Sequence, residues 1–257
     1  MDVFAVEGLP EVRPGDDVAG LIAGQTDLRD GDVVCVASTV VSKAAGRQAD
    51  LADFPADERA ERIAARIGEV TGEEKDPRFA QAVLEESEEL LTESPFILAV
   101  TRFGHITVNA GIDRSNVPDA DLLLLPEAPT AEAEAIRAGL RERTGGDVAV
   151  IVTDTSGRPF RLGQRGVALG WAGVAAARDW RGERDRDGRE LGVTVQAVVD
   201  ELAAAANLVT GEGDGGTPAA VVRGFEFGDH GERDALYRDP ENDVVRQALR
   251  EWSYVRD

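Results

Sequence analysis

Cysteine and lysine are nearly absent from this chain of 257 residues, and long hydrophobic runs are missing. The single cysteine, Cys35, excludes an internal disulfide and a cysteine-based zinc cluster. It lies in an apolar run, which predicts a core thiol in a reducing compartment. No apolar run approaches the ~20 residues of a membrane span, and the first residues lack the basic and apolar regions of a secretion signal. We therefore expect a cytoplasmic protein with no membrane partner.

Basic residues are outnumbered, with 28 Lys and Arg against 49 Asp and Glu, and the net charge is −21. This charge repels phosphate and argues against a nucleic-acid partner. Acids are spread along the whole chain, which is typical of proteins from a cytoplasm of molar salt. An acidic, arginine-rich protein from a GC-rich genome is the alternative. The two lysines are therefore informative: Lys43 follows an apolar run, whereas Lys75 lies in an acidic run that we expect to be solvated.

Hydrophobic spacing predicts strands and helices that do not alternate steadily. Strands are predicted at 32–37, 147–153 and 218–223, a hairpin at 96–101 and 106–109, and helices at 55–68, 79–91, 130–143 (capped by Thr130), 194–209 and 242–252. This order favours an α+β fold with mixed and antiparallel sheets and flanking helices over a doubly wound sheet. The whole chain forms one functional unit of two lobes. The expected boundaries are 1–112 with 190–257 for a nucleotide-binding lobe, and 113–189 for the second.

Five polar or glycine-rich stretches follow these predicted elements: EGLPEVRPGD (7–16), ASTVVSK (37–43), NAGIDRSN (109–116), TDTSGR (153–158) and GEGDGG (211–216). Glycine-rich turns expose backbone N–H groups that can bind phosphate, and Lys43 adds a compact cation. Asp113, Asp154 and Glu212 offer carboxylates, and Thr155 a hydroxyl, for a hard divalent cation. The stretches indicate nucleotide and metal chemistry, although no standard phosphate-loop or dinucleotide motif is present.

Each stretch also has a purely structural interpretation. The segment 211–216 alone is typical of a flexible loop, and Asp154 can cap a turn. Asp113 and Asn116 can form an Asx turn, and Lys43 can be a surface lysine. The carboxylates come from distant stretches, which favours an enzyme over these alternatives.

Taken together, the motifs resemble one protein family from about Val6 to Trp252. The segments, in order, are GLPEV, ASTVVSKAAGR, FAQAVLEESEELL, FGHITVNAGIDRSNV, VIVTDTSGRPFRLGQRGVALG, DWRGERDRDGRELGVTV, DELAAAANLVTGEG and PAAVVRG. The co-occurrence of NAGID-x-SN, TDT-x-GR-x-F and ANL-x-x-GEG makes the match specific. The chain resembles the coenzyme F420-0:L-glutamate ligase family, with the composition of a halophilic archaeon.

The resemblance implies a GTP-dependent ligase. Such enzymes join L-glutamate to the lactyl carboxylate of the deazaflavin coenzyme F420-0 through an acyl phosphate, releasing GDP and phosphate. A second glutamate follows through the γ-carboxylate of the first. The resemblance also implies divalent Mg or Mn, a monovalent K ion and an interlocked homodimer. A GTP-binding regulatory protein without ligase chemistry is the alternative, followed by a nucleotidyl transferase and a structural protein.

The resemblance further implies roles for residues matched motif by motif. The residues implied at GTP are Leu9, Pro10, Glu11, Val12, Ser38, Thr39, Lys43, Asn116, Thr210, Gly211, Glu212, Gly213, Asp214, Gly215, Gly216 and Thr217. The implied metal ligands are Asp113, Asp154, Thr155 and Glu212, and the implied catalytic residues are Lys43, Asp113 and Asp154. Thr210 and Thr217 stand where the family tends to have apolar residues, so we expect only their backbone to matter. Arg158, Arg161 or the arginines of 178–189 are expected to bind the anionic substrate.

Overall fold

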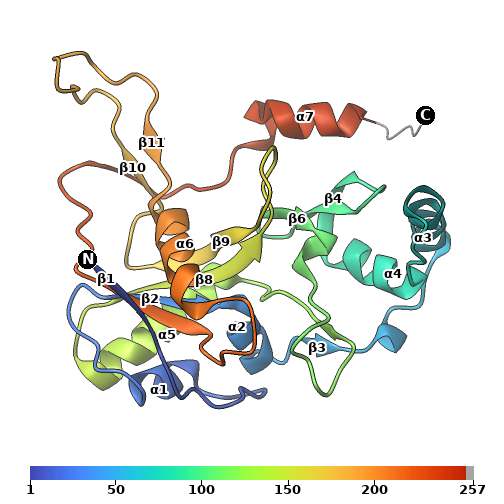
Figure 1. Ribbon diagram of the computed structural model, residues 1–257, viewed down its shortest axis with the longest axis horizontal. Helices are drawn as coiled ribbons and strands as arrows, with labels where there is room; N and C mark the ends of the chain where they lie inside the picture. The colour runs from blue at the N-terminus through green and yellow to red at the C-terminus, as the bar shows by residue number, and fades with distance from the viewer. Residues whose placement is uncertain (253–257) are drawn as a thin grey trace. The chain divides into compact units, whose positions relative to one another are not determined.

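The computed structural model describes residues 1–252, which form two compact units (Figure 1). The first unit contains Met1–Ala45 and Ala128–Leu236. The second contains Gly46–Glu127 and the described residues from Tyr237 onward. These boundaries differ from the predicted lobes, because the chain changes units at residues 45–46 and 127–128 and not near 112 or 189. Residues 253–257 of the predicted first lobe lie outside the described residues.

The first unit is built on a mixed sheet of five strands. Their order is β1 (Asp2–Ala5), β12 (Ala219–Arg223), β2 (Val33–Ala37), β8 (Ala149–Ser156) and β9 (Arg165–Ala172). β2 and β8 run parallel, and the other neighbours are antiparallel. β2, β12 and the first half of β8 consist mainly of valine, isoleucine and alanine, because helices cover both faces of the sheet.

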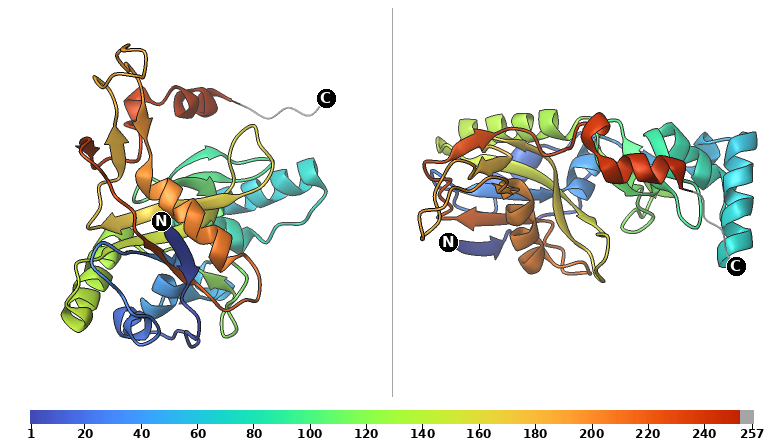
Figure 2. Two further views of the ribbon diagram at one scale, coloured as in Figure 1. Left: turned by 60° about the vertical axis from the view of Figure 1, so that its left-hand side comes forward. Right: turned by 90° about the horizontal axis from the view of Figure 1, so that it is seen from above.

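Helices on opposite faces of this sheet give the first unit three layers. α1 (Val18–Ala23) and α5 (Pro129–Thr144) pack on one face, and α6 (Val198–Thr210) packs on the other (Figures 1 and 2). Alternate residues of β2 serve the two faces, so Val34 faces α1 and α5 while Cys35 faces α6. Burial raises the pKa of the Cys35 thiol to about 12. The prediction of a core thiol is confirmed.

Two glycines of β9 let helices approach the sheet closely. A Cβ on Gly170 would lie 2.2 Å from the carbonyl carbon of Pro129 at the start of α5. A Cβ on Gly166 would lie 2.4 Å from the carbonyl oxygen of Ala203 in α6. The same unit contains α2 (Ser38–Ala44), which follows β2 directly, and a small sheet in the order β11 (Val195–Gln196), β10 (Ala177–Asp179) and β13 (Gly231–Arg233).

The second unit has its own core and two small sheets. One sheet has the order β4 (Ser87–Thr92), β5 (Leu98–Thr101) and β6 (Ile106–Val108), and the other pairs β3 (Gln48–Ala49) with β7 (Leu122–Leu123). The helices are α3 (Glu58–Thr71), α4 (Pro77–Glu85) and α7 (Val244–Glu251), with short 3-10 turns η1 (Leu51–Asp53), η2 (Asn109–Gly111) and η3 (Pro240–Asn242). Phe79, Ile63 and Ile97 belong to its apolar core. Within residues 1–252, no helix has both the length and the apolar character to span a bilayer.

The mixed α+β class and most predicted elements are confirmed, and two details are wrong. The predicted helix 79–91 ends at Glu85, and its second half forms β4, which pairs with β5. This half favours a helix locally, but its pairing with β5 overrides that preference. Thr130 is not the cap of α5, because Ala128 holds the N-cap position and Pro129 is the first helical residue.

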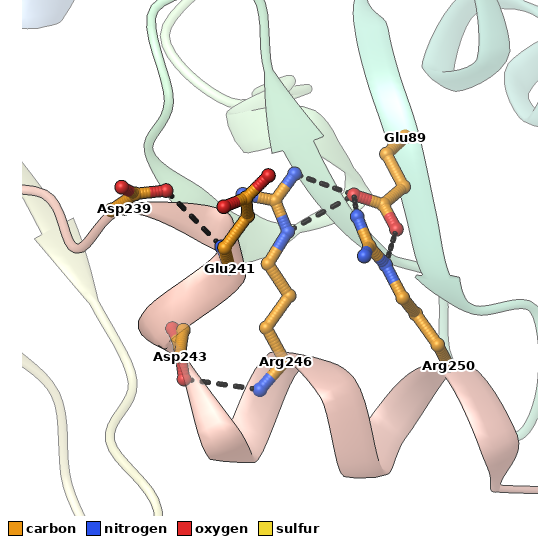
Figure 3. A network of polar contacts seen from close by, with 6 residues as sticks. All are labelled: Glu89, Asp239, Glu241, Asp243, Arg246 and Arg250. Carbon is orange, nitrogen blue, oxygen red and sulfur yellow. Dashed lines mark hydrogen bonds and ion pairs between the residues drawn. The ribbon is translucent and has the colours of Figure 1, made fainter.

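Glu89 of β4 joins the C-terminal helix α7 to the second unit (Figure 3). Its carboxylate accepts hydrogen bonds from Arg246 Nε at 3.0 Å and Arg250 Nη2 at 2.9 Å. The guanidinium groups of Arg250 and then Arg246 lower the pKa of Glu89 to about 2. Asp243 caps the start of α7 by accepting from the backbone N–H groups of Val245 and Arg246.

Candidate functional site

The ends of β2 and β8 bring two predicted stretches together in the first unit. The strands are parallel, so their carboxyl ends share one edge of the sheet. Ser38 begins α2 directly after β2. Asp154 and Thr155 lie near the C-terminal end of β8. Ser38 Oγ donates to Asp154 Oδ1 at 3.3 Å. This contact joins a residue implied at GTP to a residue implied at the metal.

Glu212 joins the same strand end from the loop that follows α6. Thr155 Oγ1 donates to Glu212 Oε1 at 2.9 Å. Asn207, in the last turn of α6, donates its amide Nδ2 to the same carboxylate oxygen at 2.7 Å and lies 3.4 Å from Thr155 Oγ1. The structure therefore brings together Thr155 and Glu212, two of the predicted metal ligands. We name Thr155, Asn207 and Glu212 the oxygen cluster.

The sequence reasoning missed Asn207. The residue lies in the quoted motif ANL-x-x-GEG, five positions before Glu212, and received no role there. An asparagine in the last turn of an alanine-rich helix could have indicated this role, because its amide can hydrogen-bond the loop that follows the helix. Its contact with Glu212 also depends on the bend after Gly211, which has φ 70° and ψ −174°.

Lys43 lies in a helix and not in a loop, and it is buried. The stretch 37–43 was predicted to be loop-like, but residues 38–44 form α2. Only 8% of Lys43 is exposed, so the surface-lysine interpretation is wrong. Its Nζ is 2.5 Å from Glu11 Oε1, and the Glu11 side chain is 60% exposed. A buried ammonium therefore points to the GLPEV loop, where the resemblance implies GTP.

The other residues of the GLPEV loop differ in what they expose. Val12 is only 4% exposed and belongs to the core of the first unit, and Leu9 packs against the same core. Pro10 and Glu11 are exposed. The apolar side chains thus hold the loop in place, and the parts available to a ligand are the backbone and the Glu11 carboxylate.

The glycine-rich loop after α6 is tied at its base. Thr217 Oγ1 donates to the backbone carbonyl of Thr210 at 3.2 Å, so the two ends of the loop meet. Residues 211–216, including Asp214 and the glycines, are exposed. The hydroxyl of Thr217 therefore contributes to the structure beyond the backbone role predicted for it.

Asp113 and Asn116 belong to the second unit. Asp113 pairs with Leu123 through a β-bridge, and its Oδ1 accepts from the backbone N–H of Ser115 at 2.7 Å and from Ser115 Oγ at 2.8 Å. The Asx-turn interpretation of Asp113 is therefore confirmed, with Ser115 as its partner. Asn116 is exposed and has a positive φ of 56°.

The turn before Asp113 is left-handed over three residues. Asn109, Ala110 and Gly111 have φ of 54°, 55° and 69°. Alanine rarely adopts this conformation, which costs about 1–2 kcal/mol without compensation. A Cβ on Gly111 would lie 2.5 Å from Leu125 Cδ1. The positive φ of Gly111 and the close approach of Leu125 both favour glycine in the segment before Asp113.

Lys75 is only partly exposed, in contrast to the solvated position predicted from its acidic neighbours. Its Nζ donates to Asn109 Oδ1 at 3.2 Å and lies 4.7 Å from the centre of the Phe79 ring. Burial, followed by the nearby charge of Arg114, lowers the pKa of Lys75. Local composition failed because the charge run folds back on the core of the second unit.

The arginines expected at the anionic substrate have different surroundings. Arg178 lies 5.4 Å and 5.1 Å from the ring centres of Phe225 and Phe227. Arg181 pairs with Asp179. Arg158 and Arg161 are exposed in the segment between β8 and β9. Their roles in substrate binding stay predictions.

The donor set of the first unit fits a hard divalent cation in its chemistry. Asp154, Thr155 and Glu212 offer carboxylate and hydroxyl oxygens, which Mg and Mn prefer. Within either unit, the described residues form no group of three His, Cys, Asp or Glu side chains around one point. Two surface hollows of about 410 and 610 Å³ are lined by none of the predicted site residues.

Fold and site together define an α+β protein with an oxygen-rich cluster at a strand end and a buried lysine beside an exposed loop. The family model described as F420-0:Gamma-glutamyl ligase matches residues 8–224. A protein of Haloarcula marismortui named coenzyme F420:L-glutamate ligase is 76% identical over 257 residues, covering 100% of both chains. Proteins of the same name from Natronomonas pharaonis and Archaeoglobus fulgidus are 69% and 51% identical, and each alignment covers at least 97% of both chains. The chain belongs to the F420-0:gamma-glutamyl ligase family.

Proposed function

We propose that this chain is a GTP-dependent ligase that joins L-glutamate to the lactyl carboxylate of coenzyme F420-0. The proposed intermediate is an acyl phosphate, and the products are GDP, phosphate and the amide. A second glutamate is then added through the γ-carboxylate of the first. Divalent Mg or Mn, a K ion and a homodimer complete the proposal.

Membership of the family is the observation that carries this proposal, and the geometry of the first unit supports it. The relatives named coenzyme F420:L-glutamate ligase align with this chain over nearly their whole length. The stretches of this chain that indicate nucleotide and metal chemistry include those at the ends of β2, β8 and α6, where the oxygen cluster forms. Polar residues at such strand ends are the usual place for ligand binding in sheets of this kind.

The reaction needs activation because a carboxylate is a poor electrophile and an oxide is a poor leaving group. Transfer of the GTP γ-phosphate to the lactyl carboxylate gives a mixed anhydride, and the glutamate amine then displaces phosphate. A divalent cation held by Asp154, Thr155 and Glu212 would supply charge neutralisation at the phosphate oxygens. The Lys43 ammonium, which is paired with Glu11 in the structure, would instead donate hydrogen bonds to a phosphate group of GTP.

The ion pair of Lys43 and Glu11 gives this proposal a specific feature. The buried ammonium is paired with a carboxylate. The Glu11 side chain is mostly exposed, so it can turn toward water when a phosphate oxygen replaces it. Asn207 donates a hydrogen bond to the Glu212 carboxylate and thereby orients it.

The proposal is tested by incubating the purified protein with GTP, MnCl2 and coenzyme F420-0, with and without L-glutamate, in buffer containing about 2 M KCl. We expect monoglutamyl and diglutamyl coenzyme, with one GDP formed for each amide. Glu212→Gln should lose most of this activity, whereas Glu142→Gln, an exposed change on α5, should keep it. GTP hydrolysis without amide would support the regulatory alternative, and pyrophosphate formed with the amide would support nucleotidyl transfer.

A further inference from the structure

Two cations of the second unit share one aromatic ring. Lys75 Nζ is 4.7 Å from the centre of the Phe79 ring, and the guanidinium carbon of Arg114 is 5.7 Å from it. Phe79 is only 5% exposed and is fixed in the core of the unit. The buried ring therefore makes cation–π contacts with both charged groups.

Among the described residues, Lys75 forms no ion pair with a carboxylate, although Glu61 and Glu74 line the same surface hollow as Lys75. The acceptor of its hydrogen bond is the neutral amide oxygen of Asn109. The next residue, Asp76, is engaged by Arg78 through contacts of 3.1 Å and 2.7 Å. In a chain with 49 acids and only two lysines, a half-buried lysine beside an arginine is unusual. Burial and the charge of Arg114 both act against its ammonium form.

A bound anion would stabilise such an arrangement. An oxyanion between the two cations would replace the lost hydration and offset the repulsion between like charges. The ammonium has three donor hydrogens, and the contact with Asn109 uses one of them. Arg114 is exposed, so the pair is open to solvent on its side.

The backbone around the pair is held firmly. Asn109 belongs to the left-handed turn that Leu125 packs against, and Arg114 directly follows Asp113. The cation pair is thus attached to the segment for which the family resemblance implies a metal ligand. This continuity connects the pair with the proposed reaction.

We propose that Lys75 and Arg114 form a binding site for a carboxylate or phosphate group of an anionic substrate. The site is an oxyanion site of the second unit, separate from the proposed GTP contacts of Lys43. Which substrate supplies the oxyanion rests on the proposed function. L-glutamate carries two carboxylates, and the coenzyme carries a phosphodiester and a carboxylate.

The presence of only two lysines allows a direct binding test. Protein labelled with 13C at the lysine ε-carbons gives two NMR signals, and Lys75→Met assigns them by removing one. Potassium glutamate, exchanged for KCl at constant potassium concentration, should shift the Lys75 signal in a saturable way. Arg114→Gln should weaken that binding at least fivefold. A Lys75 signal that shifts equally well in Arg114→Gln overturns the proposal.

If glutamate leaves the Lys75 signal unchanged, the same titration is made with coenzyme F420-0 as the probe, and no shift with either compound decides against the site. Neither titration requires GTP or turnover. A chain that binds the oxyanion but forms no amide would contradict the proposed function and leave this site standing.

Kinetics identify the source of the oxyanion in the active enzyme. Lys75→Met and Arg114→Gln should each raise the KM for one of the two substrates about tenfold, with kcat within about threefold and the KM for GTP unchanged. Arg114→Lys should restore most of the affinity, and Arg62→Gln, an exposed change on α3, should have no effect. Loss of kcat with all KM values unchanged would indicate a structural role and overturn the proposal.

Discussion

Replacing Glu89 by glutamine removes the carboxylate that joins α7 to β4 (Figure 3). Arg246 is 8% exposed and would remain buried beside a neutral amide. Loss of the charged partner of a buried group costs about 1–3 kcal/mol. The contact with Arg250 is more exposed, with 45% of that side chain accessible, and contributes less because water screens it. We expect Glu89→Gln to weaken the attachment of α7 by about 2 kcal/mol.

Amide hydrogen exchange of α7 measures this attachment directly. A loss of about 2 kcal/mol corresponds to exchange about 30-fold faster in α7, with the core of the first unit unchanged. Glu88→Gln is the matched control, because Glu88 is the exposed neighbour in the same strand. Equal exchange in α7 of both variants and the wild type would refute the energetic role given to Glu89.

The same pair gives a pH dependence with a definite sign. The pKa of Glu89 falls from 4.5 to about 2, so the folded state favours the ionised carboxylate. Its contribution is complete above about pH 4.5 and is lost as the pH falls toward 2. The difference in α7 exchange between wild type and Glu89→Gln should therefore shrink below pH 4.5. A difference that stayed constant from pH 6 to pH 3 would show that the charge is not responsible.

Three further predictions concern the proposed site and the charge of the chain. Lys43→Ala should raise the KM for GTP about 10- to 100-fold, since a hydrogen bond to a charged group contributes about 1.5–3 kcal/mol, while Lys75→Met leaves that KM unchanged; equal increases would contradict the separate roles. Asp154→Asn and Asp113→Asn should each lose most turnover and remain folded, and full activity in either variant would remove that residue from the metal site. The midpoint of thermal unfolding should rise between about 0.1 and 2 M KCl because salt screens the repulsion of a −21 chain, and a flat midpoint would exclude adaptation to high salt.

The parts of the fold that follow from local sequence were predictable. The strands at 33–37 and 149–156 have apolar runs that require burial on both faces, and the predicted hairpin is formed by β5 and β6. β4 could not be predicted, because its sequence favours a helix and its partners, β5 and α7, are set by tertiary structure. The boundaries of the two units likewise depend on which cores the segments join.

The candidate site divides in the same way. The motifs gave Thr155 and Glu212, which lie in contact, and Ser38 beside Asp154. The motif containing Asn207 was recognised, but its contact with Glu212 requires the turn at Gly211, which spacing alone does not give. Lys75 was predicted to be solvent-exposed because its neighbours in sequence are acidic. In the structure, it contacts the ring of Phe79 and the side-chain amide of Asn109. Electrostatic surroundings depend on distance in space, and the sequence records only distance along the chain.

Transfer of heavy oxygen from the lactyl carboxylate tests the proposed reaction most directly. Coenzyme F420-0 labelled with 18O in that carboxylate is incubated with the protein, GTP, Mn and L-glutamate, and the products are analysed by mass spectrometry. Attack on an acyl phosphate leaves one labelled oxygen on inorganic phosphate, with one GDP formed for each amide. The proposed function predicts that result. Label on GMP with release of pyrophosphate, or GTP consumption without any glutamyl product, would contradict it.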